Sequence, residues 1–70
     1  MKPAEIRALS TEEIQARLAD AREELMRLRF QQVTGQLTDT SRIRLVRRDI
    51  ARMLTILRER ELGIAREGEE

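Results

Sequence analysis

Apolar residues recur every three or four positions in two separate stretches of the chain. In the first stretch they are Ile14, Leu18, Ala21, Leu25 and Leu28. In the second they are Ile43, Val46, Ile50, Met53 and Leu57, with Leu54 beside them. Spacings of three and four place side chains on one side of an α-helix, and the approximate seven-residue repeat is typical of helices that pack side by side. The pattern therefore predicts two helices, each with one apolar stripe.

Capping signals set the expected limits of the first helix. Ser10 is followed three residues later by Glu13, so each side chain can bond the other residue's backbone amide in a capping box. Leu9 and Ile14 flank this box as a hydrophobic staple. We expect a helix from Thr11 to about Val33, ended by a glycine at position 35 that can adopt a positive φ.

The second helix is expected over residues of about 40–61. Asp39 is the predicted N-cap, with its carboxylate at the positive end of the helix dipole. Pro3 suits the first turn of a further short helical segment over residues 3–8. A short loop between two long helices gives an all-α fold, an antiparallel two-helix hairpin with a short N-terminal helical turn. Residues 1–62 form this single domain, and the acidic residues 63–70 are expected to be a flexible tail.

A hairpin of this size has a thin core, and chains below about 70–80 residues seldom gain more than about 3–5 kcal/mol from theirs. The chain is therefore expected to depend on a partner, which could be RNA, another protein or a second copy of itself. A second apolar line, offset from the first seam, runs through Met26, Phe30, Val33 and Leu37. The N-terminal segment could fold over part of this line, Leu37 could close over Phe30, or the line could be a docking surface.

Basic charge is concentrated in the second helix. Residues 42–60 hold seven arginines and two acidic residues, whereas the whole chain has a net charge of only +1. On a helix, Arg44, Arg48 and Arg52 lie on the side away from the apolar stripe. A row of fixed guanidinium groups suits a phosphate backbone, although a solvated helix face is the common alternative. The candidate RNA-binding residues are Arg42, Arg44, Arg47, Arg48 and Arg52.

Composition excludes several classes of function. The chain has no cysteine and no histidine, so thiolate and imidazole metal sites and a histidine general base are absent. Its glutamates have surface explanations in capping and ion pairs, so we expect no enzyme, no cofactor, no metal site and no small-molecule substrate. No signal peptide or membrane span is visible, which favours an intracellular soluble protein.

Six short motifs occur in an order that resembles the bacterial large-subunit ribosomal protein twenty-nine family. They are Leu-Arg-Phe-Gln at residues 28–31, Thr-Gly-Gln-Leu at 34–37, Arg-Ile-Arg at 42–44, VRRDIAR at 46–52, a Thr-x-x-x-Glu-Arg segment at 55–60, and EIRALSTEEI at 5–14. The resemblance covers residues of about 3–62. The family's Asn-Pro before the second helix is Asp39-Thr40 here, which argues against a phosphate contact by the loop.

The resemblance implies a structural component of the large ribosomal subunit in the cytoplasm. It also implies an α-hairpin that binds large-subunit rRNA near the polypeptide exit tunnel, beside ribosomal protein twenty-three, where nascent-chain factors dock. The residues alone leave open another possibility, a homodimeric four-helix bundle that acts as an RNA-binding or protein-adaptor module.

Overall fold

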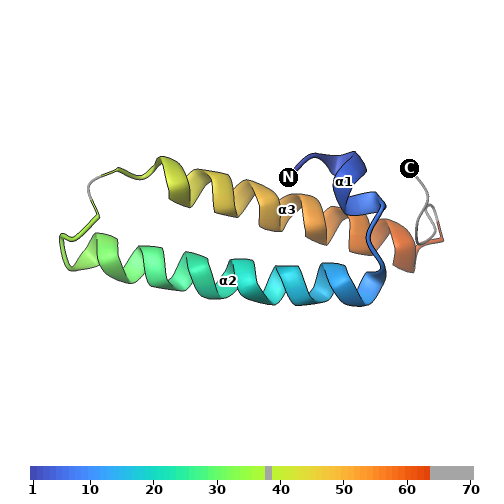
Figure 1. Ribbon diagram of the computed structural model, residues 1–70, viewed down its shortest axis with the longest axis horizontal. Helices are drawn as coiled ribbons and strands as arrows, with labels where there is room; N and C mark the ends of the chain where they lie inside the picture. Colours follow the sequence, from blue (N-terminus) through green and yellow to red (C-terminus); the bar gives the residue numbers. More distant parts are fainter. Residues whose placement is uncertain (38, 64–70) are drawn as a thin grey trace.

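The computed structural model describes residues 1–37 and 39–63, which form three helices. They are α1 (Pro3–Arg7), α2 (Thr11–Val33) and α3 (Ser41–Glu61). The long helices α2 and α3 run antiparallel, and α1 lies against the C-terminal half of α3 (Figure 1). This arrangement confirms the all-α helical hairpin with a short helical segment before it.

The predicted capping box starts α2 at the expected residue. The amide of Glu13 donates to Oγ of Ser10 at 3.1 Å, and the amide of Ser10 donates to Oε1 of Glu13 at 3.2 Å. These hydrogen bonds from Ser10 hold the pKa of the Glu13 carboxyl below its usual value. The helix ends at Val33, as predicted, and Gly35 has a φ of +79° that a side chain would strain.

The prediction for the start of α3 is wrong by one residue. The N-cap is Thr40, whose side chain makes no capping hydrogen bond, and the helix begins at Ser41. Asp39 lies one position further out, where its Oδ1 accepts the amide of Ser41 at 2.9 Å. A carboxylate can reach the amide two residues along the chain in this way. The hydrogen bonds from Ser41 lower the pKa of the Asp39 carboxyl. The carboxylate of Asp39 therefore still binds a backbone amide at the N-terminus of α3.

Two apolar clusters form the core along the contact between α2 and α3. The larger cluster holds Ile6, Ile14, Leu18, Met53 and Ile56, and the smaller one holds Leu28, Ile43 and Val46. Ala21 and Ile50 pack against both clusters and make them continuous. The predicted stripes therefore form the interface, with Ala21, Leu25, Ile50 and Leu57 half-buried in it, whereas Leu54, beside the second stripe, is exposed.

Ile6 and Ile56 enter the core because α1 packs on α3. Their side chains are 0% and 2% exposed. At 100° per residue, Ile56 lies well off the stripe that faces α2, so α2 alone would leave it exposed. The short helix α1 covers it from the other side. The periodicity predicts a core formed by the two long helices alone, and α1 contributes to it as a third helix.

Arg60 holds the chain between α1 and α2 against α3. Its guanidinium donates to Oγ1 of Thr11 at 3.0 Å and to the backbone carbonyls of Arg7 and Leu9 at 3.1 and 2.8 Å. At the other end of α1, the N-terminal ammonium of Met1 forms an ion pair with Asp49 at 2.7 Å. These polar contacts fix α1 at both ends.

Helix α3 ends at Glu61, and Gly63 follows with a φ of +75°. The end at Glu61 agrees with the predicted span of about 40–61. Residues 64–70, which make up most of the predicted acidic flexible tail, lie outside the described residues. Across residues 1–37 and 39–63, no helix has the length and apolarity needed to cross a membrane.

Candidate nucleic-acid interface

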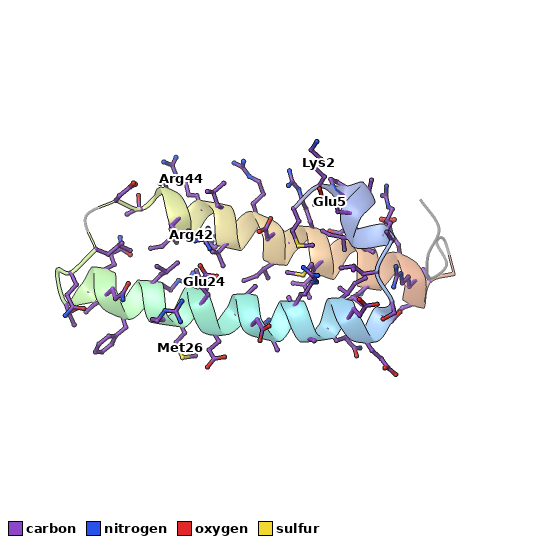
Figure 2. The ribbon with its side chains drawn as sticks, in the orientation of Figure 1. Lys2, Glu5, Glu24, Met26, Arg42 and Arg44 are labelled. Atoms are coloured by element: carbon purple, nitrogen blue, oxygen red, sulfur yellow. The ribbon has the colours of Figure 1, made fainter. Side chains whose placement is uncertain are left out.

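The outer side of α3 carries the predicted row of arginines. Ile43 and Val46 are buried against α2. At 100° per residue, Arg44 and Arg48 lie roughly 130° and 170° from the middle of this buried pair, so both are on the outer side of the helix. Figure 2 shows Arg44 pointing away from α2. The burial pattern thus supports the two-sided helix that the sequence predicts.

Three of the five candidate arginines have guanidinium groups without a partner among residues 1–37 and 39–63. Arg44, Arg47 and Arg48 are exposed, and none of their side chains forms a hydrogen bond or ion pair there. Arg47 lies on the flank of the outer face rather than at its centre. Each group keeps five N–H donors in a planar fork, which suits phosphate oxygens. These three residues define the outer arginine face.

The other two candidates, Arg42 and Arg52, already have partners within the chain. Arg42 points toward Glu24 on α2 (Figure 2), with its Nε and Nη2 at 2.8 and 2.7 Å from Oε1. Arg52 is half-buried and donates from Nη1 to the carbonyl of Met1 at 2.6 Å. Phosphate binding by all five residues remains a prediction. Arg42 and Arg52 would have to bind phosphate while their guanidinium groups also contact other residues of the chain.

A groove between α1 and α3 adds a residue that sequence reasoning missed. Arg7 lies beside Arg48 and Arg52 at this groove, which has a volume of about 240 Å³. More than forty positions separate Arg7 from these two residues in the sequence, and no periodic pattern links them. Only the burial of Ile6, the residue before it, could have suggested where Arg7 lies.

The second apolar line is largely exposed on α2. Met26, Phe30 and Val33 have 74%, 68% and 85% of their surface exposed. Neither proposed covering occurs, because Ile6 is buried in the larger core cluster and Leu37 packs against the smaller one. Met26 points away from α3, on the opposite side of the molecule from Arg44 (Figure 2). We name Met26, Phe30 and Val33 the α2 apolar face.

The fold and its exposed arginines define a class of small basic α-hairpin proteins. A family model described as ribosomal L29 protein matches residues 4–60, which is most of the chain. The chain belongs to the ribosomal L29 protein family. This family consists of structural, non-enzymatic proteins of the large ribosomal subunit, so the resemblance seen in the sequence motifs and the expectation that the chain is not an enzyme are both confirmed.

Individual relatives agree with the family model. The chain is 64% identical over 64 residues to large ribosomal subunit protein uL29 of Roseiflexus castenholzii, covering 91% of this chain and 97% of that protein. It is 57% identical over 61 residues to the protein of the same name from Corynebacterium diphtheriae, covering 87% and 80%. For the Mycobacterium avium protein the identity is 54% over 65 residues, covering 93% and 84%.

Proposed function

We propose that this chain is a structural constituent of the large ribosomal subunit that binds large-subunit rRNA through the outer arginine face. It acts in translation, in the cytoplasmic ribosome, near the polypeptide exit tunnel that the family resemblance implies. The observation that supports this most directly is the set of exposed guanidinium groups on Arg44, Arg47 and Arg48, which have no partner among the described residues and lie outside the buried stripe of α3. Membership of the ribosomal L29 protein family supplies the class of partner.

The geometry favours recognition of the RNA backbone over base reading. A helix with its side chains is about 10–12 Å wide, which is too wide for the deep, narrow groove of A-form RNA. Arg44 and Arg48 lie one turn apart, so both project to the same side and can bind phosphates of one strand. Bidentate guanidinium–phosphate hydrogen bonds would fix the position of the hairpin on the RNA.

The α2 apolar face is proposed to contact a neighbouring ribosomal protein. Exposed apolar side chains in a contiguous line are typical of protein contacts. Because Met26 and Arg44 point to opposite sides of the molecule (Figure 2), one chain can bind rRNA and protein at the same time. The family resemblance makes ribosomal protein twenty-three the candidate neighbour and implies that nascent-chain factors approach the same region.

Charge reversal on each long helix tests the assignment of the RNA-binding face. The test variant carries Arg44→Glu, Arg47→Glu and Arg48→Glu. A matched control carries Arg17→Glu, Arg22→Glu and Arg27→Glu, which change the net charge equally at exposed positions of α2. Binding to deproteinised large-subunit rRNA is measured across a salt series, with circular dichroism as a check of folding.

The wild-type chain is expected to bind with an affinity that falls steeply with salt. The α3 variant should lose most of this affinity. Its salt slope, which is the slope of the logarithm of the affinity against the logarithm of the salt concentration, should become shallower by about one unit for each phosphate contact removed. The α2 control should lose much less. Equal losses in the two variants would overturn the proposed face, and so would an unchanged slope in the α3 variant.

A further inference from the structure

The groove between α1 and α3 is lined by both apolar and basic residues. The apolar ones are Pro3, Ala51 and Ile56, and the basic ones are Arg7, Arg48 and Arg52. The volume of about 240 Å³ lies just below the range of about 300–1,000 Å³ that is usual for ligand pockets. A site of this size suits one flat ring system with an attached anionic group.

The residues that line the groove carry a net positive charge, which is only partly neutralised within the chain. Glu59 is the one acidic residue among those that line the groove, and its Oε1 lies 3.5 Å from Nη2 of Arg7. Arg52 uses its Nη1 for the carbonyl of Met1, and its other guanidinium nitrogens have no partner among the described residues. Arg48 has no partner among the described residues. An anion therefore has donors here that the fold does not need.

The groove is also continuous with the outer arginine face. Arg48 belongs to the outer arginine face, because it follows Arg44 by one turn of α3, and it also lines the groove. An RNA strand that binds Arg44 through a phosphate would therefore reach the groove at its next contact with the helix. The short helix α1 lies against the C-terminal half of α3 (Figure 1), and its residues Pro3 and Arg7 line the groove.

We propose that this groove receives one unpaired nucleotide of the large-subunit rRNA. The inference depends on the proposed rRNA-binding function and adds the element of RNA that the site recognises. The base lies against the apolar lining at Ala51, and the guanidinium of Arg48 binds the phosphate. Proteins recognise unstacked bases in loops and bulges by packing them on side-chain surfaces, including the planes of arginine guanidinium groups. A chain whose one aromatic residue, Phe30, lies on another helix must use such non-aromatic surfaces.

Filling the groove without changing any charge tests this proposal. In the first variant, Ala51→Leu, a larger side chain replaces an exposed alanine of α3 that lines the groove. A second variant, Thr55→Leu, fills the same groove from the next turn. The matched control is Ala19→Leu, the same change at an exposed position of α2. Leucine is a good helix former, so all three variants should fold.

Two measurements are made with deproteinised large-subunit rRNA, namely affinity across a salt series and a chemical footprint of the bases. Wild-type chain should protect one unpaired nucleotide. Ala51→Leu and Thr55→Leu should expose that nucleotide again and weaken binding about tenfold, which corresponds to about 1.4 kcal/mol. Their salt slopes should equal that of the wild type, because every phosphate-binding charge is retained. Ala19→Leu should behave as the wild type does.

The outcomes separate the groove from the function on which it depends. If wild-type chain binds the rRNA and both groove variants keep its affinity and footprint, the nucleotide site is wrong and the proposed function stands. Weaker binding with an unchanged footprint also overturns the nucleotide site, since the groove would then act on something else. If wild-type chain does not bind the rRNA, the proposed function and the nucleotide site both fail.

Discussion

Arg42 of α3 is paired with Glu24 of α2 across the hairpin. Two guanidinium nitrogens, Nε and Nη2, lie 2.8 and 2.7 Å from Oε1 of the glutamate. The pair joins the two long helices near the end of the hairpin where they are connected (Figure 2). Arg44, two residues further along, points to the opposite side. Two arginines of one motif therefore have different surroundings, and their substitutions should have different effects.

Replacing each of these arginines by alanine should separate stability from RNA binding. Arg42→Ala removes a largely exposed ion pair, so the free energy of unfolding should fall by less than about 1 kcal/mol. Its salt slope for rRNA binding should stay close to that of the wild type. Arg44→Ala should leave stability unchanged and lower the slope by about one unit. A slope lowered equally by Arg42→Ala would mean that Arg42 leaves Glu24 to bind a phosphate.

Periodicity and capping were sufficient to predict the hairpin. Spacings of three and four identified buried residues of both long helices, such as Ile14 and Val46, because a helix must bury one continuous stripe. The capping box of Ser10 located the start of α2 because its partners are only three residues apart. The start of α3 was missed by one residue, since Asp39 can serve a helix terminus from either of two positions.

Contacts with α1 could not be predicted, because they join residues about fifty positions apart. Ile56 lies off the stripe that faces α2, and the docking of α1 places Ile6 in the same core cluster. The same applies to the candidate site. The sequence grouped Arg52 with the free arginines because nothing local indicates that its partner is the carbonyl of Met1. Local patterns therefore predicted which residues share a helix face, but not which of these residues form contacts with distant parts of the chain.

The docking of α1 predicts that its single buried isoleucine matters as much as a residue of the main seam. Ile6→Ala and Ile56→Ala should each lower the free energy of unfolding by about 2–4 kcal/mol, because each leaves a cavity in the larger core cluster. Val33→Ala, at a position 85% exposed, is the control and should change it little. Urea denaturation followed by circular dichroism measures all three. An Ile6→Ala variant as stable as the control would show that α1 does not remain docked in solution.

Arg60 should be more sensitive to conservative replacement than its neighbour Arg58. The guanidinium of Arg60 serves Thr11 and the carbonyls of Arg7 and Leu9, whereas a lysine ammonium is a single point that cannot span these acceptors. Arg60→Lys should lower the free energy of unfolding by about 1–3 kcal/mol. The buried Nε of Arg60 has no partner among the described residues, which favours the lower part of that range.

The control for Arg60 is Arg58→Lys, at an exposed position whose side chain makes no hydrogen bond or ion pair with the part of the chain that the structure describes. Its stability should equal that of the wild type. Thermal unfolding of both variants at one salt concentration makes the comparison. Equal melting temperatures for the two variants would show that the three hydrogen bonds of Arg60 add nothing to the docking of α1.

Acid should weaken the hairpin partly through two capping carboxylates. Hydrogen bonds lower the folded-state pKa values of Glu13 and Asp39 below their ordinary values of 4.5 and 3.8. A carboxyl whose pKa is lower in the folded chain binds protons more readily when unfolded. Its contribution is therefore complete above the ordinary pKa and is lost as the pH falls through the lower folded-state value. The melting temperature should fall as the pH decreases from about 5 to about 3.

Removing these two titrations should make the fall less steep. The double variant Glu13→Gln and Asp39→Asn keeps side-chain oxygens that can accept the same amide hydrogen bonds but cannot be protonated in this range. Glu12→Gln is the control, because Glu12 accepts no hydrogen bond from the described residues. Because both carboxyl groups are fully exposed, the effect will be modest, and the slope of melting temperature against pH is its most direct measure. If the double variant follows the wild-type slope throughout, the capping hydrogen bonds do not favour the ionised carboxylates.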